Sequence, residues 1–141
     1  VYKRQGLEVG TLNSAMLTMQ TAYMSVYGPT TVGAEKDGML RLLDSTYFAT
    51  DQITVGEQVG GVFSLADSYL DTDDAGVFID SGGLMSVESS SSCYLYPLSG
   101  DPGVHVRSGV VSVSDCSFVY SGGSGVLDSL DGRLEGNSLR K

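Results

Sequence analysis

The sequence predicts an all-β fold, a right-handed parallel β-helix (solenoid) of about five to six coils with about 22–23 residues in each. Three observations predict it. A column of valines recurs along the chain at steps of 22 to 27 residues. Pairs of apolar residues two positions apart recur in the same order, and such pairs mark strands because alternate side chains share a face. Glycine, serine and aspartate form the corners between these strands, and the glycines serve where the chain needs positive φ or close approach of backbones.

The contents of the period exclude other repeat folds. Three short strands and their corners fill the period and leave no room for a helix, which excludes leucine-rich, ankyrin and tetratricopeptide repeats. A four-stranded propeller blade needs about 40 residues. Each coil is therefore expected to stack on the previous one at about 4.8 Å, which places every strand in a parallel sheet.

The repeat has three apolar columns, a polar corner and a set of glycines. The first column is expected to consist of Val9, Val32, Val55, Val77, Val104 and Val126. The second consists of Leu17/Met19, Leu40/Leu42, Phe63/Leu65, Met85/Val87, Val111/Val113 and Leu134. The third is mainly aromatic and consists of Tyr23, Tyr47, Tyr69, Tyr94, Phe118 and Leu139. The corner before it holds Thr21, Asp44, Asp67, Asp115 and Asn137, and the glycines that precede the second column are Gly38, Gly61, Gly83, Gly109 and Gly132.

The first residues, 1–5, lie outside the repeat. Their sequence VYKRQ is encoded by GTG TAT AAG AGA CAG, which resembles the transposase end sequence used in preparing sequencing libraries. We interpret this segment as a non-native scar on a metagenomic gene fragment; the alternative is an ordinary basic leader. Residues 6–141 are then expected to form a single β-helix domain from a longer solenoid, with the flanking coils of the parent protein as partners.

Within this domain the repeat is not equally regular. Residues 6–27 are expected to form a less regular first coil, and residues 32–75 form two clean coils. The long step from Val77 to Val104 is absorbed in the serine run 89–92, in the loop 99–103, or in both. A loop extension on a solenoid is a common binding site, and it is equally a place where insertions are tolerated.

Composition and charge narrow the classes of function. The 141 residues allow one domain, and a hydrophobic content of 41% suffices for the narrow core of a solenoid. The chain contains no run of about 18 apolar residues, so no membrane span is expected. A net charge of −9 disfavours nucleic-acid binding, which needs a basic face. The acidity suits an extracellular or cell-surface protein.

The two cysteines, Cys93 and Cys116, are 23 residues apart, which is one coil. Equivalent positions on neighbouring coils would bring them within reach of a disulfide, which an extracellular location would favour. The alternative is a pair of unpaired thiols that serve as small core residues. A metal site is disfavoured because neither cysteine has a CxxC partner or a nearby histidine.

Aspartates form the first candidate site. Asp74 and Asp101 each precede a first-column valine by three positions, so they are expected to stack on adjacent coils with Asp73 beside them. Stacked carboxylates need a calcium ion, a shared proton or a solvated turn. As a catalytic set, Asp73, Asp74 and Asp101 would act on a glycosidic bond, with His105 and Arg107 nearby. The alternative is that aspartates simply form solvated corners. We expect no cofactor, with calcium as the alternative.

Other outward residues complete the candidate binding set, which is Asp74, Asp101, His105, Arg107 and Tyr96. Asp80 and Arg107 each follow a first-column valine by three positions, so these opposite charges are expected to stack. His105 lies between two inward valines and is expected to point outward. Tyr96 and Tyr120 are expected to be exposed, whereas the tyrosines of the third column fill an inward ladder with their hydroxyls at its rim.

With these columns in place, residues 9–139 resemble the right-handed parallel β-helix superfamily, which includes pectate-lyase-like proteins and many bacterial surface adhesins. GGVFSLADSYL and SGVVSVSDCSFVY are similar to the repeats of autotransporter-type adhesins. DTDDAGVFIDSGG and SGDPGVHVRSG are similar to the aspartate turns of polygalacturonases and to the turns of carbohydrate-binding β-helix modules. In the second of these segments Pro102 replaces a paired aspartate, and neither Gly-His-Gly nor Arg-x-Lys follows.

The resemblance implies a secreted or cell-surface bacterial protein. We expect a non-enzymatic, adhesin-like segment that presents side chains to a glycan or to another cell-surface ligand. The alternative is a fragment of a polysaccharide lyase or glycoside hydrolase of the pectate-lyase-like fold, and a phage tail-spike segment is a further alternative.

Overall fold

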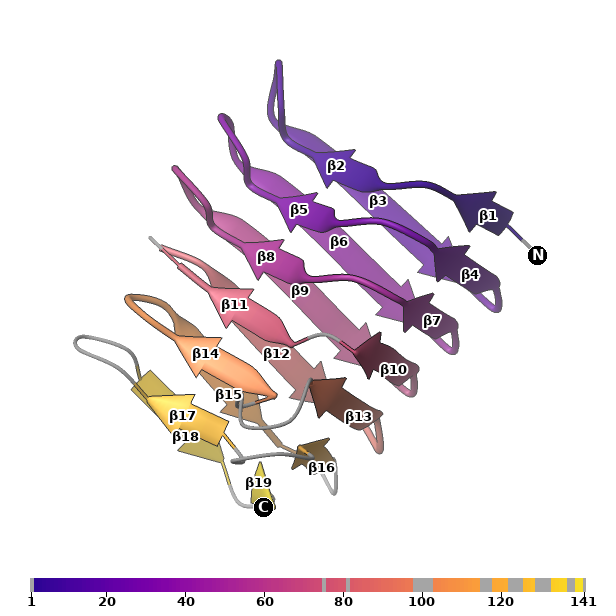
Figure 1. The fold of residues 1–141 in the computed structure, drawn as a ribbon, viewed down its shortest axis with the longest axis vertical. Helices are drawn as coiled ribbons and strands as arrows, with labels where there is room; N and C mark the ends of the chain where they lie inside the picture. The colour runs from indigo at the N-terminus through magenta and orange to yellow at the C-terminus, as the bar shows by residue number, and fades with distance from the viewer. Residues whose placement is uncertain are drawn as a thin grey trace.

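The computed structural model describes residues 2–74, 76–80, 82–97, 103–114, 118–121, 126–128, 133–136 and 139–140, with side chains from residue 5 to residue 114 except those of 74 and 97. These residues form a parallel β-solenoid in which three flat sheets run along the length of the molecule (Figure 1). Every assigned element is a strand, and this part of the chain contains no helix that could span a membrane. The predicted fold class is confirmed.

Each sheet is a file of strands from successive turns, and all neighbours are parallel. The spatial order in sheet A is β1 (Tyr2–Arg4), β4 (Tyr23–Val26), β7 (Thr46–Ala49), β10 (Tyr69–Asp74), β13 (Ser92–Pro97), β16 (Phe118–Ser121) and β19 (Leu139–Arg140). Sheet B contains β17 (Val126–Asp128), β14 (Val104–Val106), β11 (Val77–Ile79), β8 (Ile53–Val55), β5 (Thr30–Val32) and β2 (Leu7–Val9). Sheet C contains β18 (Arg133–Gly136), β15 (Val110–Val113), β12 (Leu84–Glu88), β9 (Gly61–Ala66), β6 (Gly38–Leu43) and β3 (Ala15–Gln20).

The chain visits the sheets in the order B, C and A in every turn. About four turns of the solenoid are described with their side chains, against the predicted five to six coils. Strands β2 to β13 make up four successive turns, and β14 to β19 extend the same three sheets in the region that the structure describes only in part.

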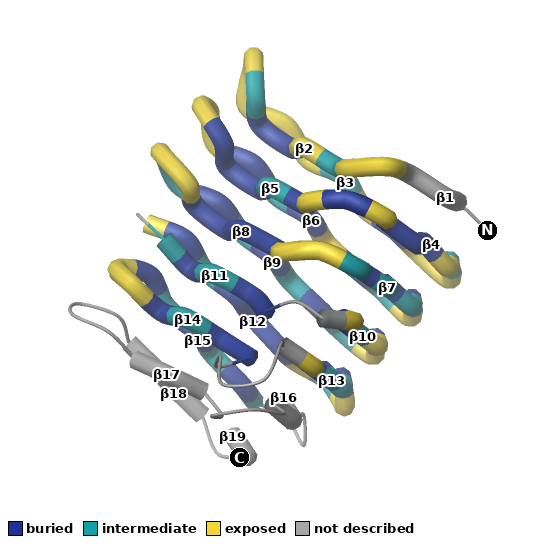
Figure 2. Tube along the Cα trace, in the orientation of Figure 1, coloured by how far each residue is buried: buried dark blue, intermediate teal, exposed yellow. Residues whose placement is uncertain are grey.

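The core is the narrow space between the three sheets (Figure 2). The second apolar column forms the file in sheet C as predicted, because Leu17, Leu40, Phe63, Met85, Val111 and Leu134 are successive Cα partners. From Leu40 to Val111 these side chains are fully buried. Stacking equivalent residues in one file is therefore the main source of apolar burial in this fold.

The predicted alignment of the first-column valines in one file is only partly correct. Val9, Val32 and Val55 are aligned, and so are Val77, Val104 and Val126, but these are two different files of sheet B. The next partner of Val55 is Ile79, whereas Val77 pairs with Ile53. The connection from β11 to β12 is two residues shorter than that from β8 to β9. A shift by two positions keeps every side chain on the same face, so the apolar pattern does not reveal it.

The prediction that the third column forms one continuous inward file is wrong. Tyr23 and Tyr69 both pair with Thr46 and point outward, with exposed fractions of 41% and 37%. The inward file of sheet A consists of Met24, Tyr47, Leu70 and Cys93.

Among the column tyrosines of sheet A, Tyr47 is the fully buried one. Its hydroxyl forms a 2.7 Å hydrogen bond with the buried hydroxyl of Thr30, and its ring meets that of Phe63 edge-on at 6.1 Å. Burial raises the pKa of Tyr47. The hydrogen bond explains how a phenol is accommodated in an apolar core.

The polar corner residues adopt an unusual backbone conformation that the sequence analysis did not assign to them. Thr21, Asp44 and Asp67 have φ angles of 49°, 46° and 48°, a left-handed conformation that aspartate tolerates better than most residues. Gly38 and Gly61 have a different role, which is close backbone packing. A Cβ atom on Gly38 would lie 2.2 Å from the carbonyl oxygen of Val9. Close backbone packing at these two glycines agrees with the prediction.

The extra residues of the long step lie in both predicted places. The serine run contains two left-handed residues, Ser89 and Ser90, where earlier corners have one. The register places the larger part between β13 and β14, which includes residues 98–102 outside the described part of the chain.

Candidate functional site

A file of buried serine hydroxyl groups, which we call the serine ladder, forms hydrogen bonds at the corner that leads into sheet A. Ser45, Ser68 and Ser91 accept 3.1 Å hydrogen bonds from the backbone N–H groups of Ala22, Ser45 and Ser68, each one coil earlier. Each hydroxyl also donates to a carbonyl of its own coil, and for Ser45 and Ser68 this bond measures 2.7 Å. The serine ladder fixes the starting point of β7, β10 and β13, and therefore the positions of the side chains that follow.

The sequence analysis missed the serine ladder. Its members share two signals that could have been used: each directly follows a small polar residue at the corner, and they are 23 residues apart. Serine at such corners has a physical reason, because one hydroxyl can both accept and donate where backbone groups lack partners.

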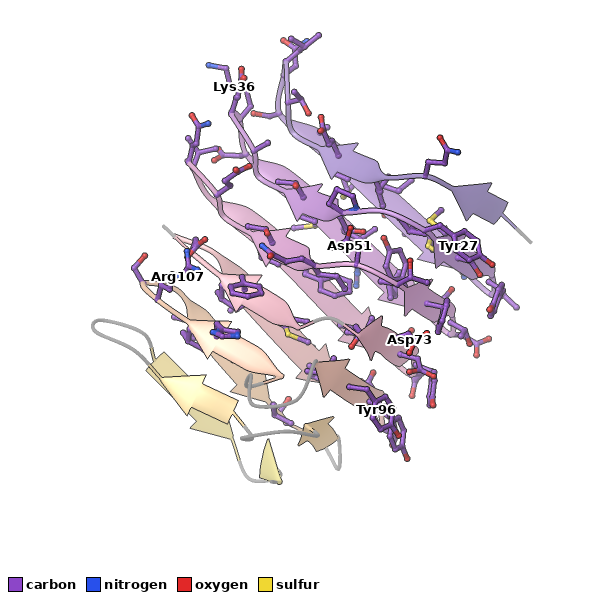
Figure 3. The ribbon with its side chains drawn as sticks, viewed as in Figure 1. Tyr27, Lys36, Asp51, Asp73, Tyr96 and Arg107 are labelled. Atoms are coloured by element: carbon purple, nitrogen blue, oxygen red, sulfur yellow. The ribbon has the colours of Figure 1, made fainter. Side chains whose placement is uncertain are left out.

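The main candidate site is on the outer side of β10 and β13, and we call it the tyrosine face. It consists of Tyr69, Asp71 and Asp73 on β10 and of Tyr94 and Tyr96 on β13. Asp71 is the Cα partner of Tyr94, and Asp73 is the Cα partner of Tyr96. Figure 3 shows Asp73 and Tyr96 projecting from these neighbouring strands. The rings of Tyr69 and Tyr94 are 5.2 Å apart and tilted by 33°.

The inward residues beneath the tyrosine face are completely buried. Leu70, Thr72, Cys93 and Leu95 each have no exposed surface. The hydroxyl of Thr72 accepts the backbone N–H of Tyr96 at 3.3 Å, which ties the exposed tyrosine to the strand below it. The face is therefore built on a packed and hydrogen-bonded sheet rather than on a loop, which favours a fixed arrangement of its side chains.

The electrostatics of the face centre on Asp71. Partial burial raises the pKa of Asp71, the neighbouring charge of Asp73 raises it further, and a hydrogen bond from Tyr69 opposes these effects. Burial also raises the pKa of Tyr69, with the charge of Asp71 as the next cause. Asp71 is thus a carboxyl group that holds its proton above the usual aspartate range, and the protonation of this face depends on pH.

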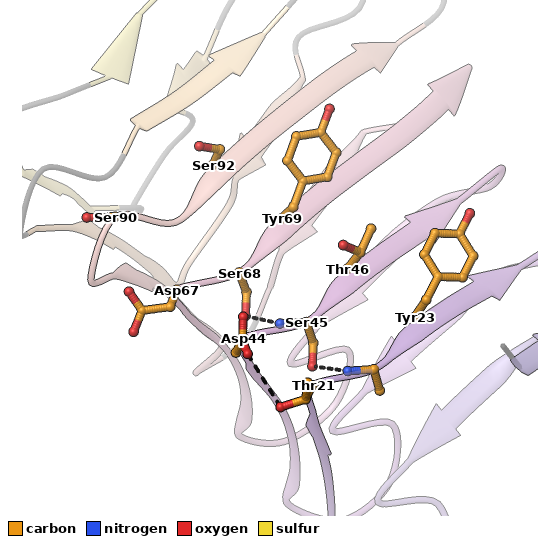
Figure 4. A pocket seen from close by; sticks show the side chains of 11 residues that line it. Thr21, Tyr23, Asp44, Ser45, Thr46, Asp67, Ser68, Tyr69, Ser90 and Ser92 are labelled. Atoms are coloured by element: carbon orange, nitrogen blue, oxygen red, sulfur yellow. Dashed lines mark hydrogen bonds between the residues drawn. The ribbon is translucent and has the colours of Figure 1, made fainter.

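An open trough of about 590 Å³ adjoins the tyrosine face and runs back along sheet A. Tyr23 and Tyr69 flank it, with Thr46 between them, and Figure 4 shows their rings rising on the same side of the sheet. Its floor is lined by the hydroxyl-rich corner, where Thr21 donates to Asp44 at 3.4 Å. The trough offers aromatic surfaces two coils apart above a row of small polar groups.

The predicted site residues of sheet A are only partly described. Tyr96 is exposed as expected, at 47%, and Asp73 is exposed beside it. The Cα partner of Asp74 on β13 is Pro97. Asp101 and the side chain of Asp74 lie outside the described residues, so their stacking stays a prediction.

His105 and Arg107 lie elsewhere, on the outer side of sheet B. The ring of His105 is stacked on Phe78 at 4.1 Å with an angle of 8°, and the guanidinium of Arg107 lies 5.3 Å from the same ring. Arg107 Nε is 3.6 Å from Asp80 Oδ1, which confirms that these two charges stack on adjacent coils. Because the cluster belongs to a different sheet, it does not join Tyr96 and Asp73 in one site (Figure 3).

Cys93 is fully buried in the inward file of sheet A, and burial raises the pKa of its thiol. Its Cα partner on β16 is Val119. Cys116 lies outside the described residues, so the proposed relation between the two cysteines stays a prediction. Among the described residues, no group of three or more His, Cys, Asp or Glu side chains is arranged to hold a metal ion.

Comparison with known protein families, with curated proteins and with solved structures gives no match. The functional argument therefore rests on the chemistry of the tyrosine face. Its aromatic rings can stack on the apolar side of a sugar, and its carboxylates can accept hydrogen bonds from sugar hydroxyls.

Proposed function

We propose that this chain is a non-enzymatic, adhesin-like segment of an extracellular or cell-surface bacterial protein, and that it binds a glycan through the tyrosine face. One observation carries the proposal: Tyr69, Tyr94 and Tyr96 stand with Asp71 and Asp73 on the outer side of two adjacent strands. The net charge of −9 is compatible with exposure on a cell surface.

The shape of the site supports a polymer as ligand. Small molecules are usually held in concave pockets that bury most of their surface. The tyrosine face and the adjoining trough are instead open and extend over several coils. A chain of sugar rings can contact successive coils because equivalent positions recur at the strand spacing of about 4.8 Å.

The test is a glycan-binding assay with two variants of the face. We expect Tyr69→Ala and Tyr96→Ala each to weaken binding at least tenfold, about 1.4 kcal/mol, because each removes one stacking surface. Tyr27→Ala is the matched control, since Tyr27 is 52% exposed but follows β4, three turns away from β13. Wild-type affinity in both face variants, or no binding across a broad glycan panel, would contradict the proposal.

The alternative function is cleavage of a polysaccharide, and one observation favours it. The raised pKa of Asp71, next to the carboxylate of Asp73, resembles the pairing of an acid with a base that glycoside hydrolysis requires. Release of new reducing or unsaturated ends from a polysaccharide, abolished in both Asp71→Asn and Asp73→Asn, would establish this function. Binding without any release of ends would leave the adhesin-like function.

A further inference from the structure

The tyrosine face has a one-sided charge. Asp71 and Asp73 occupy outward positions of β10, and the outward positions described on β4, β7, β10 and β13 include no lysine or arginine. The whole chain carries a net charge of −9, which adds a field that attracts cations to any part of its surface. A ligand of this face therefore meets negative charge that no neighbouring basic group on those strands neutralises.

The carboxylates are interleaved with aromatic rings. Asp71 has Tyr94 as its cross-strand partner and Tyr69 two residues before it on the same outer face, and Asp73 has Tyr96 as its partner. A cation placed at either aspartate can thus contact a carboxylate and approach the face of a tyrosine ring at the same time. Cation–π attraction then adds to the attraction between the two charges.

We propose that the ligand of the tyrosine face is an amine-bearing glycan, a polymer of hexosamine units with free ammonium groups, in preference to neutral or acidic glycans. This inference rests on the proposed glycan-binding function and names its ligand class. The sugar rings stack on tyrosine, and the ammonium groups lie at Asp71 and Asp73. A neutral sugar keeps only the stacking contacts, and a uronic acid is repelled by both carboxylates.

The position of the strands favours a glycan over a lysine-rich peptide. An extended peptide gains much of its affinity by adding a strand to an exposed sheet edge. Strands β10 and β13 lie inside sheet A between β7 and β16, so their backbone groups already pair with neighbouring strands. Recognition at this face must therefore come from side chains that contact rings and charged substituents.

The protonation of Asp71 provides supporting pH behaviour. The groups that face it are Tyr69 and Asp73 on its own strand and Tyr94 on β13, while its partner on β7 is the uncharged Phe48. Because its pKa is raised, part of the carboxylate charge is missing in mild acid. Binding of an ammonium group should therefore strengthen as pH rises through the titration of Asp71.

Two oligomers with the same backbone test the proposal. Titration calorimetry compares a glucosamine hexamer with an N-acetylglucosamine hexamer, in which acetylation removes every positive charge. We expect the glucosamine hexamer to bind at least tenfold more tightly at low salt and to lose affinity as salt is added. The double variant Asp71→Asn/Asp73→Asn should lose this preference, whereas Glu57→Gln should keep it, since Glu57 is exposed on the connection between β8 and β9.

The outcomes separate this inference from the proposed function. Equal or tighter binding of the N-acetylated hexamer, lost in Tyr96→Ala, overturns the amine preference and keeps glycan binding at this face. An unchanged preference in the double aspartate variant also overturns it, provided that circular dichroism shows the variant folded. A lysine hexamer that binds more tightly than the glucosamine hexamer refutes the choice of a glycan. Failure of all three ligands to bind overturns the inference, and the broad glycan panel then decides the proposed function separately.

Discussion

The serine ladder makes a quantitative prediction for Ser68→Ala. The hydroxyl of Ser68 accepts the N–H of Ser45 and donates to the carbonyl of Ala66, and the residue is only 5% exposed. Truncation leaves a buried N–H group without its partner, which costs about 1–3 kcal/mol. Loss of the second hydrogen bond adds about 1 kcal/mol, so we expect the free energy of unfolding to fall by about 2–4 kcal/mol.

The same reasoning predicts a gradient along the ladder. Ser45→Ala breaks the bond from Ala22, which is only partly buried, so water can replace part of what is lost. We expect Ser45→Ala to cost about half as much as Ser68→Ala. Ser64→Ala is the control, because Ser64 lies on the outer side of sheet C, and such surface changes are usually within about 0.5 kcal/mol.

Urea unfolding followed by circular dichroism measures these differences, with the slope of the transition checked for each variant. The reasoning is refuted if Ser68→Ala unfolds at the wild-type urea concentration. It is equally refuted if Ser45→Ala proves more destabilising than Ser68→Ala, because the order of burial would then not govern the cost.

Three further predictions concern packing, pH and the ends of the sheets. Gly38→Ala should prevent folding or lower the melting temperature steeply, because its Cβ would lie 2.2 Å from a carbonyl oxygen. Gly60→Ala should melt close to wild type, because its Cβ would lie 3.2 Å from the movable Asp37 carboxylate and no closer than 3.9 Å to backbone. Folding raises the pKa of Asp71, so the folded state binds its proton more tightly, and the stability that Asp71 contributes should fall as pH rises through the aspartate range. Asp71→Asn should lack this contribution. Melting temperatures of wild type and Asp71→Asn that follow the same pH dependence would contradict the prediction. Strands β2 and β3 are sheet edges, and β3 carries no charge or proline, so the isolated chain should associate or fray there. A chain that sediments as a monomer at micromolar concentration and melts sharply would count against this.

Two signals in the sequence allowed the stacking in sheet C to be predicted in full. Spacing by two marks the inward positions of strands such as those that hold Leu40 and Phe63, and a glycine stands two residues before most of these pairs. Because both signals recur together, they leave only one register. In sheet B a glycine directly follows the valines up to Val55 but none of the later ones. A shift of two residues after Val55 left the burial of the valines unchanged.

The tyrosines of sheet A were misassigned for a different reason. Tyr69 follows its corner residue Asp67 by two positions and points outward, whereas Tyr47 follows Asp44 by three and points inward. Aligning the chain by aromatic character concealed this difference, and aligning it by the left-handed corner residue would have revealed it. The tyrosine face also depends on which residues of β10 and β13 lie side by side. The corner before β13 has one more left-handed residue than the earlier corners, and this changes where β13 begins.

The hydrogen bonds of the serine ladder that join one coil to the next all run in one direction along the solenoid. The amide of each coil is completed by a hydroxyl that belongs to the coil after it, from Ala22 through Ser45 to Ser68. During synthesis from the N-terminus, the amide of each corner therefore lacks this hydrogen bond until the next coil has formed. Every coil thus completes the corner of the coil before it, and its own amide is completed by the coil that follows.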